Sequence, residues 1–201
     1  NIMTKLDRAN FDAFGEPMPD IYSDALAALR GYAQSKLGST TASSIVFSAG
    51  LNRRLYSYTT EFADFFMDAS GRIKKEIILK VSDYRSAVIQ GKFFAKKGIW
   101  VSEYRVESGL NCGGHAFAGN GFLIGPVLAE FKAHREELAA ELTQICREAL
   151  KQQNRPVPDV LPPFRVTAQG GIGTAQEDIF LKRHYESETN HIRMLVKKLA
   201  Y

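Results

Sequence analysis

Apolar residues recur along this chain with two different spacings that alternate. Short runs rich in β-branched and aromatic residues predict buried strands over 44–49, 76–81, 99–106 and 164–168. Apolar positions three or four residues apart predict helices over 21–37, 51–66, 84–96 and 126–152. The capping-box pattern Thr174-Ala-Gln-Glu177 predicts the start of one more helix. Strands that alternate with helices favour a parallel sheet covered by helices.

The predicted fold class is therefore α/β, built of parallel β/α units. A doubly wound sheet and a TIM-barrel-like (β/α)8 sheet both fit this alternation. A complete barrel typically needs about 250 residues, so we expect this chain of 201 residues to supply an incomplete barrel. Residues 1–43 are predicted to be a helical lead-in and 44–201 a β/α barrel-type domain, within a single domain overall. Residues 189–196 are the candidate for a closing strand.

Two glycine-rich segments each follow a predicted strand. The first contains Gly113 and Gly114, and the second contains Gly170, Gly171 and Gly173. Glycine has no Cβ between its backbone amide and a bound group, and ligands of α/β proteins sit beyond the carboxyl ends of the strands. Both segments are therefore expected to face a ligand.

The second segment has the chemistry of an anion site. It ends at Thr174, where a helix is predicted to begin, so free backbone amides and the positive end of the helix would point to one place. Phosphate is the natural anion for such a site. The alternative is that these glycines only allow a sharp turn from strand to helix.

Polar side chains in the first segment are the candidates for chemistry. His115 has a side chain suited to proton transfer near neutral pH, although it could equally be hydrogen-bonded for structure. Asn111 is a further polar side chain of this segment. Cys112 is interpreted as a small buried residue, and Cys112-x-x-His115 supplies only two ligands where zinc needs about four. No metal site is therefore predicted.

Composition excludes several classes of protein. The basic residues are scattered and the net charge is only +4, which argues against a nucleic-acid partner. No apolar run reaches the roughly 20 residues that span a bilayer, so no membrane partner is expected. Two cysteines do not make a disulfide framework, and we expect a reducing cytoplasmic environment.

With these residues the chain resembles the nitronate monooxygenase (2-nitropropane dioxygenase) family of FMN-dependent (β/α)8 barrels. That family has a strand, a helix and a strand that runs into Gly-x-Glu-Ala-Gly-Gly-His, and later a strand ending in Ala-x-Gly-Gly-Ile. The corresponding segments here read Gly109-Leu-Asn-Cys-Gly-Gly-His115 and Val166-Thr-Ala-Gln-Gly-Gly-Ile172. The match covers roughly residues 44 to 181. Asn111 and Cys112 stand where the family has Glu-Ala.

The resemblance implies a bound FMN whose phosphate and ribityl chain lie against the glycines of both segments, with His115 near the flavin. The expected function is an FMN-dependent oxidoreductase, a flavoprotein of the monooxygenase type, that acts on a small organic substrate. Cofactor-binding residues would be Gly113, Gly114, Gly170, Gly171, Gly173 and Thr174, and catalytic residues His115 and Asn111.

Two other functions remain open. A lyase or isomerase could hold the phosphate of a small phosphorylated metabolite in the same segments, with His115 and a carboxylate such as Glu103 or Glu107 doing the acid–base work. Strand alternation places these two glutamates on one face. A non-enzymatic subunit is the third alternative, in which a homo-oligomer or a partner chain completes the barrel.

Overall fold

One parallel sheet organises the residues that the computed structural model describes, which are 2–4, 9–107, 124–169 and 174–186. Neighbouring strands are parallel, and their order across the sheet is their order along the chain. The strands are β1 (Ile2–Thr4), β2 (Ser43–Phe47), β3 (Lys75–Val81), β4 (Val101–Glu107) and β5 (Arg165–Gln169). The prediction of a parallel α/β fold is confirmed.

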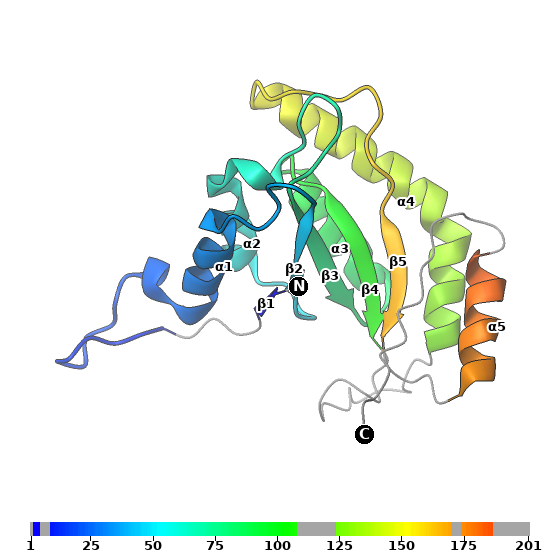
Figure 1. The fold of residues 1–201 in the computed structure, drawn as a ribbon, viewed down its shortest axis with the longest axis horizontal. Helices are drawn as coiled ribbons and strands as arrows, with labels where there is room; N and C mark the ends of the chain where they lie inside the picture. Colours follow the sequence, from blue (N-terminus) through cyan, green and yellow to red (C-terminus); the bar gives the residue numbers. More distant parts are fainter. Residues whose placement is uncertain (1, 5–8, 108–123, 170–173, 187–201) are drawn as a thin grey trace.

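Helices pack behind this sheet and along its two sides. They are α1 (Asp24–Gln34), α2 (Arg53–Tyr58), α3 (Tyr84–Ala95), α4 (Ile124–Gln152) and α5 (Ala175–Glu186). In Figure 1, α3 lies behind the sheet, α1 and α2 lie on the β2 side, and α4 runs along the β5 side with α5 beside it. No helix in the described part of the chain is both long and apolar enough to cross a lipid bilayer.

The core fills the space between the sheet and the helices. Every second residue of β3 enters it, beginning with Ile77, and these side chains pack in one cluster with Phe94 of α3 and Leu138 of α4. The alternate residues of the same strand therefore lie on the opposite face of the sheet. That second face carries the polar residues considered below.

Two of the predicted helices agree closely with the structure. Helix 84–96 corresponds to α3, and its cap is Asp83, whose Oδ1 accepts a hydrogen bond from the Ser86 backbone N–H at 2.7 Å. Helix 126–152 corresponds to α4, which begins two residues earlier and continues for 29 residues. It stops before a loop that contains four prolines between 156 and 163.

The predicted helix over 51–66 is wrong in its extent. The structure has the six-residue α2, followed by single-turn 3-10 helices at Thr59–Glu61 and Ala63–Phe65. Two threonines explain the break, because the Thr59 hydroxyl donates to the Tyr56 carbonyl at 2.6 Å and the Thr60 hydroxyl to the Ser57 carbonyl at 2.8 Å. These side chains occupy backbone acceptors that a continuing helix would use.

The predicted helix over 21–37 is also shorter than expected. A 3-10 turn at Asp20–Tyr22 precedes α1, and α1 ends at Gln34 because the Ser35 hydroxyl donates to the Tyr32 carbonyl at 2.7 Å. Leu37, the last residue of the predicted helix, lies beyond α1 and is 53% exposed.

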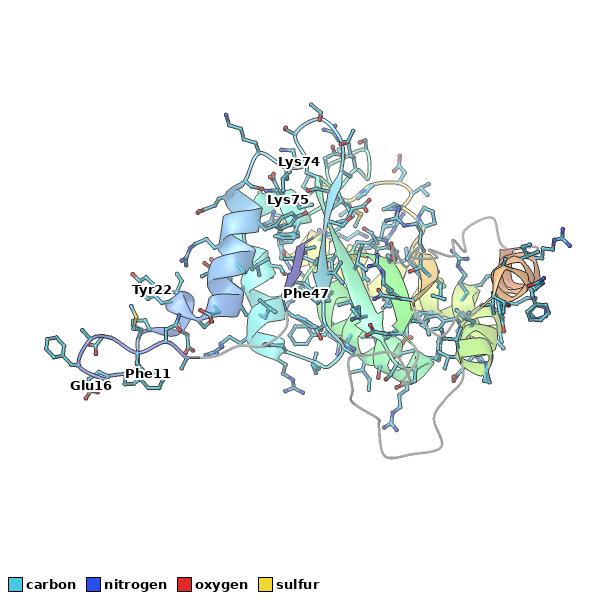
Figure 2. The ribbon with its side chains drawn as sticks, turned by 60° about the horizontal axis from the view of Figure 1, so that its bottom comes forward. Phe11, Glu16, Tyr22, Phe47, Lys74 and Lys75 are labelled. Carbon is cyan, nitrogen blue, oxygen red and sulfur yellow. The ribbon has the colours of Figure 1, made fainter. Side chains whose placement is uncertain are left out.

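The first 43 residues are predicted to be a helical lead-in, but they also contain a strand and an extended arm. They contain β1, which the apolar pattern did not predict, and an arm that leaves the sheet before α1. The arm projects away from the body of the molecule in Figure 1, and Figure 2 shows Phe11 and Glu16 on it. A bridge between Phe11 and Pro17 and hydrogen bonds to Asp12 Oδ1 shape the arm.

Candidate functional site

A polar face covers the side of the sheet opposite the core. Its charged members come from three adjacent strands, namely Glu76 and Lys80 of β3, Glu103, Arg105 and Glu107 of β4, and Arg165 of β5. Barrel and sheet interiors are normally filled by apolar side chains. A face with six charged side chains, three of them buried, is therefore a candidate site for chemistry.

A β-bulge decides which residues of β4 reach this face. Ile77 pairs with Val101, but Ile78 pairs with Glu103, so Ser102 is the extra residue. Val101 packs in the core, and the bulge turns Glu103 to the opposite face. Arg105 and Glu107 follow at two-residue steps. The prediction that Glu103 and Glu107 share a face is confirmed by their contacts with the same layer of side chains.

The middle of the polar face is organised around the Glu103 carboxylate. Arg105 donates to Glu103 Oε1 from Nε at 2.9 Å and from Nη2 at 2.7 Å, and the Thr167 hydroxyl donates to the same oxygen at 2.7 Å. Arg165 lies between two carboxylates, with Nη2 at 2.9 Å from Glu76 Oε2 and Nε at 3.6 Å from Glu103 Oε2. Glu103 is thus held by fixed partners.

A second cluster lies at the carboxyl end of the strands. Lys80 Nζ is 2.6 Å from Glu107 Oε1, and the two side chains are only 11% and 7% exposed. Gln169 Nε2 donates to the same Glu107 oxygen at 3.4 Å. We call Lys80, Glu107 and Gln169 the edge cluster. Each residue is the last or next-to-last of its strand.

The strand register aligns the ends of the two strands that precede the glycine-rich segments. Glu107 pairs with Gln169 in the parallel ladder between β4 and β5. Glu107 and Gln169 are the last residues of their strands, and the residue that follows each of them begins a glycine-rich segment. The two strands that lead into these segments therefore end side by side at one edge of the sheet, at the edge cluster.

Most predicted site residues lie outside the described residues. These are Asn111, Gly113, Gly114 and His115 of the first segment and Gly170, Gly171 and Gly173 of the second. Thr174 is described: it is exposed and immediately precedes α5. A helix thus begins where the capping pattern predicted one, directly after the second glycine-rich segment.

Lys80 and Gln169 are site residues that the sequence reading missed. The sequence does contain an indication for Lys80. Lys80 alternates with Ile77, Leu79 and Val81 along an apolar strand, so its side chain lies on the opposite face of the sheet from theirs. A lysine at such a position must face away from the core or be paired within it. Gln169 gave no comparable signal.

A separate cavity of about 220 Å³ opens near the amino ends of the strands. Glu76, Ser102 and Arg165 line its polar side, and Ile73 and two prolines line its apolar side. It lies at the opposite end of the polar face from the edge cluster. No group of three or more His, Cys, Asp or Glu side chains among the described residues could hold a metal ion.

Comparisons of the chain with models of protein families, with curated proteins and with solved structures find no match. The case for a function therefore depends on the geometry above and on the residues of the two segments.

Proposed function

We propose that this chain acts as an FMN-dependent oxidoreductase of the nitronate monooxygenase-like type, on a small organic substrate. The observation that carries the proposal is the register of β4 and β5, which pair up to Glu107 and Gln169. Both glycine-rich segments of the FMN-barrel pattern then start from adjacent strand ends, as a single cofactor held by both would require.

Strand order supports a barrel rather than a doubly wound sheet. In a doubly wound sheet the order reverses at a switch point, whereas in a (β/α)8 barrel each strand lies beside its neighbours in the chain. Here all neighbouring strands are parallel and in chain order from β1 to β5. We therefore propose that the sheet is part of a TIM-barrel-like structure.

The described residues suit both the phosphate end and the flavin end of FMN. The amino end of α5, which follows the second glycine-rich segment, offers backbone amides and a positive dipole to the phosphate. At the same edge, the Lys80 ammonium offers a cation to the flavin ring, where protein charge tunes the redox properties of the cofactor. Gly113, Gly114, Gly170, Gly171, Gly173 and Thr174 are the proposed contacts to its phosphate and ribityl chain.

FMN would supply the capacity to take two electrons from a substrate carbon and pass them to an acceptor. The residues of the chain would position the substrate and move protons. We assign proton transfer at the substrate to His115 and a hydrogen bond to the substrate or ring to Asn111. Glu103 is not assigned as an acid or base, because Arg105 and Thr167 already bind its carboxylate.

The absorption spectrum of the purified protein tests the proposal. We expect a yellow protein with flavin absorption bands, or a colourless one that becomes yellow on addition of FMN and remains so after gel filtration. A protein that takes up no FMN from a molar excess contradicts the proposal.

The lyase or isomerase alternative is favoured by one observation, the start of α5 after the second glycine-rich segment, which suits any phosphate. Retention of inorganic phosphate or a sugar phosphate, without flavin uptake, would support that alternative.

For a subunit whose barrel is completed by another chain, gel filtration would show an oligomer that loses its cooperative melting when dissociated.

A further inference from the structure

We propose that Glu107 is a positioning residue that holds the Lys80 ammonium at the carboxyl edge and offsets part of its charge toward the bound cofactor. This inference rests on the proposed function, because it concerns the flavin end of the same site. It adds a residue that neither the glycine-rich segments nor their resemblance points to.

The contact between the two side chains is direct and largely shielded from solvent. Lys80 Nζ lies 2.6 Å from Glu107 Oε1, with 11% and 7% of the side chains exposed. A lysine side chain is long and flexible, so its ammonium has a fixed place only where partners hold it. Glu107 is the carboxylate within ion-pairing distance of Lys80 among the described residues.

The carboxylate is itself held in place from the other side. Gln169 Nε2 of β5 donates to Glu107 Oε1 at 3.4 Å, and the backbones of Gln169 and Glu107 pair in the ladder. Glu107 therefore links β3 to β5 across β4. The Lys80 ammonium is oriented by a carboxylate that belongs to β4 and contacts β5, the two strands that precede the glycine-rich segments.

Because the two side chains carry opposite charges, removing one or the other should have opposite effects on the reduction potential of a bound flavin. The ion pair has no net charge, so Glu107→Gln leaves a positive charge at the edge and Lys80→Met leaves a negative one. Electrostatic effects are stronger in a buried site than in water. FMN gains negative charge on reduction, so these variants should shift its reduction potential in opposite directions.

The same strand offers a matched control. Glu103 is on the same face and similarly buried, but its carboxylate binds Arg105 and Thr167 rather than Lys80. Glu103→Gln therefore removes a buried carboxylate of β4 without freeing the Lys80 ammonium, and the positive charge that it leaves on Arg105 is farther from the carboxyl edge of the sheet. It should leave the flavin potential near that of the parent protein.

The experiment measures FMN affinity and the midpoint potential of the bound FMN in the full chain and its variants, with the melting temperature as a check on folding. For Glu107→Gln we expect reduced FMN to gain about tenfold in affinity relative to oxidised FMN, an upward shift of about 30 mV for a two-electron couple. For Lys80→Met we expect a shift of similar size downward. Glu107→Asp should fall between the parent and Glu107→Gln.

Shifts of the same sign in both variants, or an unchanged potential in Glu107→Gln, would overturn the inference while leaving FMN binding by the parent protein intact. A parent protein that binds no FMN overturns the proposed function and this inference together. If Glu107→Gln does not fold, the double variant Lys80→Met/Glu107→Gln removes both charges. Its potential should then lie above that of Lys80→Met, and equality with Lys80→Met would contradict the proposal.

Discussion

The ammonium of Lys75 lies 2.7 Å from the backbone carbonyl oxygen of Tyr32, at the carboxyl end of α1. The same ammonium donates to the carbonyls of Ala33 and Ser35. Lys75 is 1% exposed, and burial lowers the pKa of its amine. This first residue of β3 satisfies carbonyls that the end of a helix leaves without partners.

Replacing Lys75 by methionine should destabilise the protein by about 3 kcal/mol, because buried carbonyls lose a charged donor. The neighbouring Lys74 is the control, since its side chain is 54% exposed and pairs with Asp64 at the surface. Figure 2 shows both lysines near the end of α1. Lys74→Met should change the free energy of unfolding by no more than about 0.5 kcal/mol. Equal losses in the two variants, measured by urea unfolding, would contradict this role for Lys75.

Asp83 should contribute to stability in a pH-dependent way. Burial would raise the pKa of its carboxyl, but hydrogen bonds from the Ser86 backbone and from the hydroxyls of Ser82 and Ser86 outweigh burial and lower it. The contribution is therefore complete above the unfolded pKa of 3.8 and is lost as pH falls through the lower native pKa.

Asp83→Ala removes the cap of α3 and should cost about 1 kcal/mol at neutral pH. Asp83→Asn keeps a capping oxygen but does not titrate. We expect the stability difference between the parent and Asp83→Asn to shrink as pH falls below about 4, as followed by thermal melts. A difference that stays constant between about pH 6 and pH 3 would show that this carboxyl is not responsible.

Gly91 of α3 packs directly against the hydroxyl of Tyr104 in β4. A Cβ at Gly91 would lie 2.2 Å from that oxygen, and Tyr104 is fully buried. Gly91→Ala should therefore destabilise the protein by about 1–3 kcal/mol, although alanine is the better helix former. Gly31→Ala in α1 has open space around it and should instead stabilise by about 0.5–1 kcal/mol.

Tyr104→Phe should rescue Gly91→Ala. The Tyr104 hydroxyl is buried and has no hydrogen-bond partner among the described residues, so its removal should be neutral or stabilising. It also removes the atom that the methyl group introduced at position 91 would meet. A double-mutant cycle should give a favourable coupling between the two substitutions, and additive effects would mean that the clash is relieved elsewhere.

Cys146 should be inert in the folded protein. It is fully buried in α4, and burial raises the pKa of its thiol to about 12. In a Cys112→Ser background, a thiol reagent at about pH 8, near the pKa of an ordinary thiol, should react only after the protein is unfolded by guanidinium. Rapid reaction of the native protein would mean that α4 opens locally far more often than its packing indicates.

Local sequence signals predicted the elements whose causes are local. The apolar run of β3, Asp83 before α3 and the prolines after α4 each define an element with residues that are close in the chain. The misplaced helix over 51–66 has a local cause as well, but it acts through single hydroxyls of Thr59 and Thr60. Such hydrogen bonds leave the apolar spacing unchanged.

The edge cluster could not be predicted because it depends on register. The contact between Lys80 and Glu107 requires the bulge at Ser102, because the bulge determines which residues of β4 share a face with Lys80 of β3. The strand β1 has three residues and no periodicity to detect. Non-local pairing thus determined the edge cluster, whereas the position of the glycine-rich segments after strands followed from the chain itself.

The order of the strands also bears on how the protein is made. Because each described strand after β1 pairs with the strand that precedes it in the chain, a growing polypeptide can add each unit to a neighbour that has already emerged from the ribosome. The ion pair between Glu76 and Arg165 is an exception, as its residues are 89 positions apart. The polar face must therefore remain incomplete until β5, the last of the described strands, is synthesised.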